Sequence, residues 1–280
     1  MNKFSVLLGS LALSPALLFA QEPESQDQVK FSGWLSVVSA YVSRGGTNSP
    51  ENDDTVLQGY VNANYKGLYA AYWVSKLGYS FSEIQDKVAI GSNSQLSDKQ
   101  KQQALADLKT PSSDYYEHDF FVGYSNKYKD WNYDLNVATY YYPGSDHTTG
   151  VEAGVSAGRT LNPAIGNSFR IGAQTYFNDT VYMNQWDSYF SLDYSHPLPQ
   201  GFQLDLSTGV SYYQDNGKFE GGTFLNTEKD WVFRHASAQV SHSLFNNDKA
   251  RGWLKYVVGG ENRAGVDQKN MLVAGMRYHF

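Results

Sequence analysis

The chain has 280 residues, with 22 Tyr, 15 Phe, six Trp, 25 Gly, no Cys and a formal net charge of −6. The lack of cysteine excludes a disulfide framework, and the net negative charge argues against a nucleic-acid-binding protein. The abundance of aromatic residues and glycine is typical of many short strands with aromatic belts.

The amino terminus has the pattern of a secretory signal peptide. Lys3 precedes an apolar run over residues 4–19, and the small residue Ala20 follows it as the expected cleavage site. We expect residues 1–20 to be removed, residues 21–30 to form a flexible polar leader and residues 31–280 to form one domain. No later segment approaches the roughly 18 consecutive apolar residues of a transmembrane helix. The mature chain is therefore expected to be periplasmic, secreted or a membrane barrel.

Twelve segments alternate apolar and polar residues with period two, which predicts strands with one apolar and one wet face. In one of the clearest, Leu135 and Val137 alternate with Asp134 and Asn136. In chain order the predicted strands are Phe31–Arg44, Val56–Tyr65, Leu68–Tyr79, Tyr115–Ser125, Trp131–Tyr141, Thr148–Gly158, Ser168–Phe177, Trp186–Tyr194, Phe202–Tyr213, Trp231–Leu244, Gly252–Glu261 and Gln268–Phe280.

The connections between these strands alternate between short and long. Residues 66–67 and 126–130 are tight, whereas residues 45–55, 81–114 and 214–230 are long. Short turns at one end and long loops at the other are typical of an outer-membrane barrel with an even strand number and both termini in the periplasm. A water-soluble sandwich would share the strands but not this asymmetry. The sequence predicts an all-β, transmembrane, up-and-down antiparallel barrel of about 12 strands in the outer membrane.

One insert, residues 82–113, interrupts the strand pattern. Ser97 and Gln100 have capping-box spacing, and good helix formers follow until Pro111 ends the segment. We expect a long extracellular loop that carries a short helix over residues 97–109. The loop is either a mobile outer shield or a lid, since it is the only predicted connection long enough to fold over the barrel mouth.

The last predicted strand ends on an aromatic residue at the carboxyl terminus. Phe280, Tyr278 and Met276 alternate with His279 and Arg277. This ending resembles the terminal signature of bacterial outer-membrane barrels, in which the closing strand faces lipid and carries an aromatic residue at the membrane boundary. We expect the three outward residues to act as an assembly signal for the barrel-assembly machinery.

Two segments resemble the TorF-like putative porin family. The first follows the family pattern S-D-Y-x-x-R-G, a polar loop, L-Q-G and G-x-Y, although Ala40 stands in place of the usual acid and Ser43 where an aromatic residue is common. The long insert is a further departure. The resemblance implies an outer-membrane barrel and leaves the substrate open. The matching residues are Ser39, Tyr41, Arg44, Gly45, Leu57, Gln58, Gly59, Gly67 and Tyr69, then Tyr142, Pro143, Gly144 and Glu152.

Charged residues on the predicted inward rows are candidates for the lumen and its constriction, because a charge facing lipid near the midplane costs about 2–4 kcal/mol. Arg44 either attracts anions or pairs with Glu117, Asp119 or Glu152. The acids outnumber the bases, which weakly favours cations. The candidates are Arg44, Glu117, Asp119, Asp134, Glu152, Arg170, Asp193, Asp205 and Arg277.

These features favour a narrow outer-membrane channel for passive diffusion of small hydrophilic solutes, surrounded by outer-membrane lipid. A closed barrel with a binding or structural role is the alternative. A third hypothesis is a lipid-acting hydrolase, since His235 and Ser237 share one strand face and would point toward lipid. No third catalytic member is identifiable, so we expect no enzyme. No His or Cys cluster indicates a metal, and no cofactor is expected.

Overall fold

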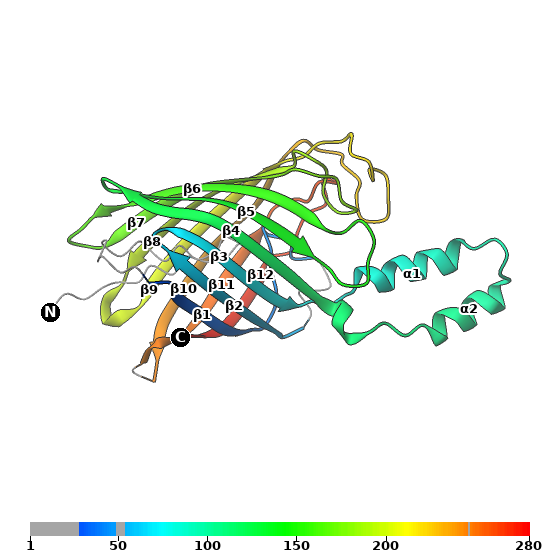
Figure 1. The fold of residues 1–280 in the computed structure, drawn as a ribbon, viewed down its shortest axis with the longest axis horizontal. Coiled ribbons are helices and arrows are strands. Elements are labelled where there is room, and N and C mark those ends of the chain that lie inside the picture. The colour runs from blue at the N-terminus through cyan, green and yellow to red at the C-terminus, as the bar shows by residue number, and fades with distance from the viewer. Residues whose placement is uncertain (1–27, 49–53, 246) are drawn as a thin grey trace.

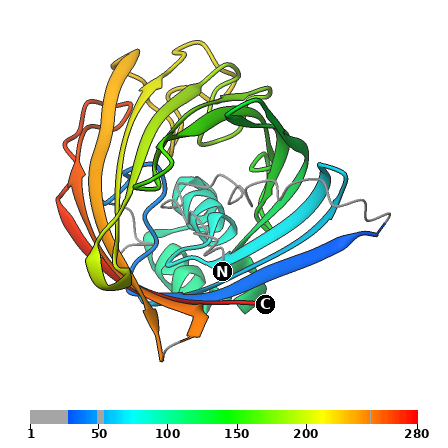
Figure 2. The same ribbon diagram turned by 90° about the vertical axis from the view of Figure 1, so that its left-hand side faces the viewer.

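The computed structural model describes residues 28–48, 54–245 and 247–280. Twelve antiparallel strands close into one barrel, in which each strand pairs with its sequence neighbours and β1 pairs with β12 (Figures 1 and 2). The predicted fold class is therefore confirmed. The predicted signal peptide, residues 1–20, and most of the predicted leader lie outside the described residues.

Three strands have the predicted bounds, namely β2, β5 and β10. The strands are β1 (Lys30–Val38), β2 (Val56–Tyr65), β3 (Leu68–Lys76), β4 (Tyr116–Tyr128), β5 (Trp131–Tyr141), β6 (Gly150–Asn162), β7 (Asn167–Tyr176), β8 (Ser188–Pro197), β9 (Gln203–Tyr212), β10 (Trp231–Leu244), β11 (Asn247–Gly259) and β12 (Met271–His279).

The largest differences from prediction are at two strand ends. β1 ends at Val38 and not at Arg44, because the chain bends at residues 39–40. It then turns again at Arg44 and Gly45, whose φ angles are 45° and 77°. β11 begins at Asn247, five residues before the predicted Gly252, and its polar first residues pair with the end of β10. Alternation of apolar and polar residues predicts the part of a strand that has one apolar and one polar face. It does not predict polar residues that extend the strand beyond that part.

Connection lengths separate the two ends of the barrel. Residues 66–67 and 129–130 are short turns at the end where β1 begins and β12 finishes, which we call the terminal end. Residues 77–115 and 213–230 are long loops at the opposite end, called the loop end, from which helices α1 and α2 project (Figure 1). The predicted asymmetry of the connections is therefore confirmed.

The insert is a helical hairpin of α1 (Phe81–Ser92) and α2 (Asp98–Asp107), followed by the short 3-10 helix η2 (Ser112–Tyr115). α2 has the predicted capping box, but α1 was missed although Ser80 accepts a hydrogen bond from the Glu83 backbone N–H at 3.3 Å. Hydrogen bonds from Lys87 and Tyr115 lower the pKa of the Glu83 carboxyl group. In the described ranges, no helix is long and apolar enough to cross a membrane.

The hairpin extends away from the barrel along its long axis and does not lie across the mouth (Figure 1). α2 has no buried residue, and only Phe81 and Ser82 of α1 are buried. The helices therefore do not form the folded-over lid that the insert length allowed. The helices contact the rest of the molecule through the first two turns of α1, where Gln85 also exchanges hydrogen bonds with the Asp146 backbone at 2.8 and 3.0 Å.

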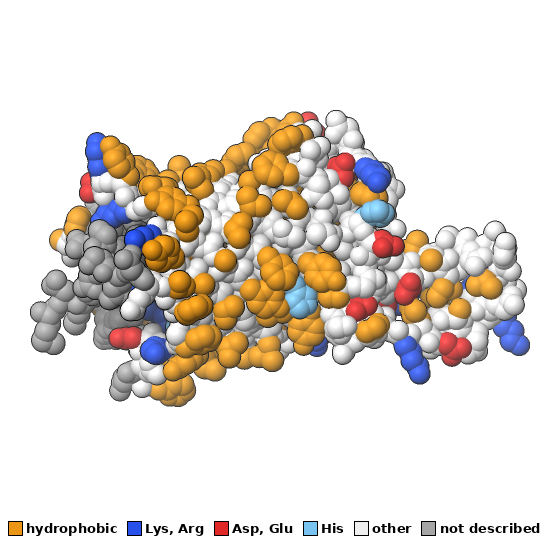
Figure 3. Space-filling model, in the orientation of Figure 1, with side chains coloured by type: hydrophobic (Ala, Val, Ile, Leu, Met, Phe, Trp, Pro, Cys, Tyr) orange, Lys and Arg blue, Asp and Glu red, His pale blue; other side chains and the backbone are white. Residues whose placement is uncertain are grey.

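Alternate residues of the wall face in opposite directions. On β1, Leu35 is 63% exposed whereas Trp34 is 3% exposed, and the same contrast separates Val122 from Phe121 on β4. On the face shown in Figure 3, apolar side chains are spread along the wall, while charged ones lie toward the two ends. Buried aromatic residues and polar groups pack inside the barrel, so the interior is where the candidate functional residues meet.

Candidate functional site in the barrel interior

Arg44 enters the barrel from the loop after β1 and pairs with Glu152 on β6. Its Nη2 lies 2.7 Å from Glu152 Oε2, which also accepts a 2.5 Å hydrogen bond from the Tyr140 hydroxyl. The guanidinium carbon lies 5.0 Å from the ring centre of Tyr189. Of the three carboxylates considered as partners for Arg44, the structure selects Glu152. The pair is well buried, with side-chain exposures of 13% and 3%.

Two further acids lie on the inner face of β4, near its loop end. Tyr41 and Tyr142 donate hydrogen bonds to Glu117 at 3.1 and 2.8 Å. Asp119, on the same face, is fully buried, and neither of its oxygens has a hydrogen-bond partner among the described residues. Together with Glu152, these residues give the loop-end half of the lumen three buried carboxyl groups, of which only Glu152 forms an ion pair in the described part of the chain.

Asp134 on β5 lies nearer the terminal end. Its carboxylate accepts hydrogen bonds from the Tyr69 hydroxyl at 3.2 Å and from the Asn136 amide at 2.7 Å. Its hydrogen-bond donors are therefore neutral, one on the same strand and one on β3. The structure places this predicted lumen residue inside the barrel but apart from the Arg44–Glu152 pair.

The remaining predicted charges on β7, β8 and β9 are also held locally. Arg170 pairs with Asp193 on the adjacent strand at 3.5 Å. Asp205 accepts hydrogen bonds from Ser195 at 2.6 Å and Gln203 at 2.7 Å. The nine predicted charges thus do not form one ring. They divide into a loop-end group, the Arg170–Asp193 pair, two acids with neutral partners and Arg277.

Arg277 on β12 is stacked on aromatic rings. Its guanidinium carbon lies 3.8 Å from the ring centre of Trp34 and 5.5 Å from that of Trp253. Gly275 makes the space for this packing, because a Cβ added there would lie 2.2 Å from the Trp253 ring. In the ranges that the structure describes, no carboxylate forms an ion pair with Arg277.

An aromatic cluster lies at the loop end of the barrel. Phe81 from α1 packs against Tyr142, Tyr182 and Phe224, with ring centres 4.8, 5.4 and 5.0 Å away. We call these four residues the aromatic plug. They come from the three loop segments after β3, β7 and β9 and from the residue that follows β5. Sequence reasoning missed the plug, although the cap at Ser80 marks where α1 begins.

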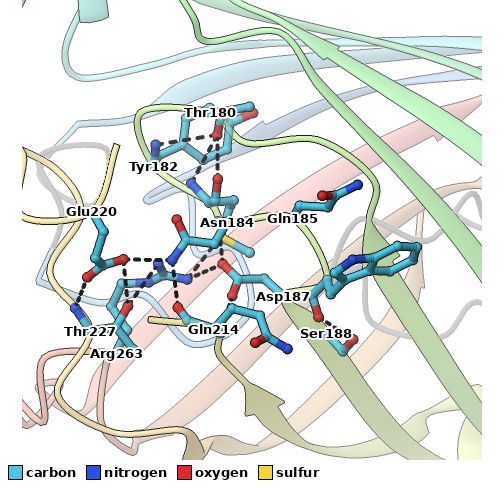
Figure 4. Close-up of polar contacts among 12 residues, drawn as sticks. Thr180, Tyr182, Asn184, Gln185, Asp187, Ser188, Gln214, Glu220, Thr227 and Arg263 are labelled. Carbon is cyan, nitrogen blue, oxygen red and sulfur yellow. Dashed lines mark hydrogen bonds and ion pairs between the residues drawn. The ribbon is translucent and has the colours of Figure 1, made fainter. Parts of the chain in front are cut away.

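Three long loops are tied together beside the plug by a buried polar cluster, which we call the loop lock (Figure 4). Arg263 pairs with Asp187, whose carboxylate also accepts the backbone N–H groups of Asn184 at 2.7 Å and Gln214 at 2.8 Å. The Asn184 side chain donates to Glu220 at 2.6 Å. Burial raises the pKa of Asp187, although Arg263 and the two N–H groups act to lower it. None of these residues lies in a sequence motif, so no local pattern could have identified them.

His235 and Ser237 both face the barrel interior, at 4% and 7% exposure. A ring nitrogen of His235 lies 2.8 Å from the Tyr189 hydroxyl, and the two rings stack. The expectation that these two residues point toward lipid, on which the hydrolase hypothesis depended, is therefore wrong. The reason is the strand register. Ser237 on β10 is paired with the buried Val257 on β11 and the buried Ser207 on β9, so all three side chains point to the inside.

The residues of the predicted assembly signal lie at the seam where the barrel closes. Phe280, Tyr278 and Met276 are exposed on the outer row of the wall. The backbone N–H of Phe280 donates to Gly33 at 3.0 Å, and Gly33 donates back to the Phe280 carbonyl at 3.1 Å. The last residue therefore completes the pairing of β12 with β1, while its role as a signal stays a prediction.

In the described segments, no group of three or more His, Cys, Asp or Glu residues is placed so that it could hold a metal ion. The small enclosed space beside Arg44, about 10 Å³, is lined by His235, Lys255 and Ser207 among others and has the size of about one water molecule. It therefore adds no room for a cofactor.

A family model described as a bacterial protein of unknown function, Gcw_chp, matches residues 20–220. No curated protein matches the chain. Among solved structures, the KdgM porin is similar with a TM-score of 0.52 and 6% identity over 89% of this chain and 99% of that one. A NanC porin structure is similar with a TM-score of 0.50 and 10% identity over 90% and 99% of the two chains. At such low identity these likenesses establish a porin-like barrel fold.

Proposed function

This chain belongs to the Gcw_chp family of bacterial proteins of unknown function, and on that premise we propose that it is an outer-membrane channel for passive diffusion of small hydrophilic solutes. The observation that carries the proposal is the contrast between the two faces of a closed wall. The outward row is apolar and exposed, whereas the inward row carries charged and amide side chains. Lipid suits the first face, and water with dissolved solute suits the second.

The direction of insertion follows from the same proposal. The terminal end would face the periplasm, and the loop end, with α1 and α2, would face outside. Residues 1–20 would direct export, and Phe280, Tyr278 and Met276 would be presented to the barrel-assembly machinery. Two residues that match in the TorF-like resemblance, Arg44 and Glu152, form the ion pair inside the barrel.

The proposed passage is narrow at its loop end. The aromatic plug and the Arg44–Glu152 pair both lie there; Phe81 and Tyr142 of the plug are buried, whereas Tyr182 and Phe224 are partly buried. Barrel width grows with strand number, and twelve strands lie between the side-chain-filled barrels of about eight and the water-filled ones of about sixteen. We infer that solute passes only when the plug shifts, so conductance is small and intermittent.

The test is reconstitution of the folded, signal-free protein in a planar bilayer with potassium chloride on both sides. We expect discrete current steps that are smaller than those of a wide porin, and none from heat-denatured protein prepared in the same detergent. A folded barrel that inserts into liposomes yet never carries current at any voltage would overturn the channel proposal.

A closed barrel with a binding or structural role is the second candidate. The favouring observation is the burial of Asp119, Tyr140 and Phe81 at 4% exposure or less, which fills the loop-end half of the interior. Complete absence of current, with unchanged folding, is the result that this candidate requires. We do not propose a hydrolase, because His235 and Ser237 face inward.

A further inference from the structure

Two arginines lie side by side on adjacent strands, close to the seam where β12 pairs with β1. Arg251 on β11 and Arg277 on β12 are paired positions in the antiparallel register. Both lie on inward rows, since their neighbours Leu254, Met276 and Tyr278 occupy the exposed outer row. Like charges directly opposite one another on adjacent strands are destabilising. The arrangement therefore needs a counter-charge that the pair itself does not supply.

No described carboxylate lies within ion-pair distance of either arginine, although Asp205 and Asp248 attract Arg251 from farther away. Arg44, Arg170 and Arg263 each have a carboxylate within ion-pair distance, but Arg251 and Arg277 have none in the ranges 28–48, 54–245 and 247–280. The nearby Asp205 is already bonded to neutral partners, Ser195 and Gln203. Within the described part of the chain, neither arginine of the pair is thus neutralised by a direct ion pair.

Described residues accept only one hydrogen bond from the side chains of the pair. Arg277 makes no side-chain hydrogen bond to a described residue, and Arg251 donates only to Ser241 Oγ, at 3.1 Å. The Nε atoms of both arginines are buried and have no partner among the described residues. Each guanidinium carries five N–H donors, so most of the donors at this place have no acceptor among the described residues.

The tryptophans hold Arg277 in a fixed orientation. Trp34 covers the guanidinium closely, at 3.8 Å, and Trp253 lies 5.5 Å away. Stacking uses the faces of the guanidinium and leaves its N–H edge free to bind in plane. That edge matches the two oxygens of a carboxylate or phosphate group. A ring that fixes a cation without neutralising it pre-organises the cation for an anionic ligand.

From this geometry we propose that Arg251 and Arg277 form an anion site in the lumen for solutes that carry carboxylate or phosphate groups. The inference rests on the proposed channel function, for which it names the solute class. A solute with two or more negative charges is favoured over one with a single charge, because two guanidinium groups face it. The site lies on strands β11 and β12, away from the three carboxyl groups of Glu117, Asp119 and Glu152.

The test measures binding on the folded protein in detergent at low ionic strength. Isothermal titration with citrate, succinate and inorganic phosphate is compared with titration of glucose, and intrinsic fluorescence is followed because Trp34 and Trp253 contact Arg277. We expect saturable binding of at least one anion and none of glucose. Citrate and succinate alone would identify a carboxylate site, and phosphate alone a phosphate site.

Variants distinguish anion binding at these two arginines from nonspecific attraction of anions to positive charges on the protein. Arg251→Gln and Arg277→Gln should each weaken anion binding about tenfold or more, as loss of a charged hydrogen bond implies. Arg277→Lys keeps the charge but not the planar fork, so it should weaken binding nearly as much. Lys129→Gln removes an exposed charge from a short turn at the terminal end and should leave binding unchanged. Each variant is first shown to fold by its heat-dependent gel migration.

The outcomes distinguish this inference from the channel proposal. Wild-type protein that binds none of the anions, or arginine variants that bind as well as Lys129→Gln, would overturn the site. Such a result together with current steps in the bilayer would leave the channel proposal intact. Anion binding that depends on Arg277 in a barrel that carries no current would support the site and reject the channel.

Discussion

Arg44 and Glu152 are 108 residues apart in sequence and meet inside the barrel at 2.7 Å, where Tyr140 bonds to the same carboxylate oxygen. Arg44 comes from a loop and Glu152 from β6. The pair therefore joins the chain segment that follows β1 to the far side of the wall. Its energetic role can be tested with single and double variants.

Glu152→Gln should destabilise the barrel by on the order of 3 kcal/mol, because Arg44 would remain buried without its counter-charge. The measurement is the denaturant midpoint at which the fast-migrating, unboiled form disappears from a gel. The double variant Arg44→Met/Glu152→Met removes both charges and should lie closer to wild type. A single variant as stable as wild type would show that Tyr140 and water suffice to satisfy the site.

Arg263→Ala should loosen the loop lock, because Asp187 would be left buried and charged. We expect faster tryptic cleavage after Lys218, in the loop between β9 and β10, while the barrel itself stays protease-resistant. The matched control is Glu261→Ala, which breaks the more exposed Lys229–Glu261 pair in the same loop region. Exposed pairs contribute about 0–1 kcal/mol, so the control should cleave like wild type.

Phe81→Ala should raise the conductance or lengthen the open periods, since it removes the ring on which the aromatic plug is centred. Deleting residues 84–109 removes most of the helical hairpin but keeps Phe81 and Ser82, so currents should change little. This expectation replaces the one based on the length of the insert. Larger currents after the deletion alone would show that the hairpin itself obstructs the passage.

Removal of Phe280 should impair assembly more than export. The truncated chain loses both backbone hydrogen bonds between Phe280 and Gly33 at the seam, together with the terminal aromatic side chain. Signal-cleaved protein should accumulate in the periplasm, as measured by fractionation. Phe280→Tyr keeps the pairing and the aromatic ring and should assemble normally. Insertion of the truncated chain at wild-type levels would contradict the role given to this residue.

The barrel could be predicted from sequence because its determinants are local. A strand between lipid and lumen must alternate apolar and polar residues, and this period identified all twelve strands and the full bounds of β2, β5 and β10. The alternation of short and long connections indicated the topology in the same way. The capping box at Ser97 likewise predicted α2, since it depends on residues three apart.

Contacts across the barrel were decided only by the tertiary structure. The sequence left Arg44 with three carboxylates as possible partners, and the register of strands far apart in the chain selected Glu152. The inward position of His235, the meeting of Asp187 with Arg263 and the stacking of Arg277 on Trp34 also depend on register and on loops that converge. Alternation determines which face a side chain occupies, but only closure of the barrel determines which side chains lie opposite it, because neighbours inside the lumen come from strands that share no local pattern.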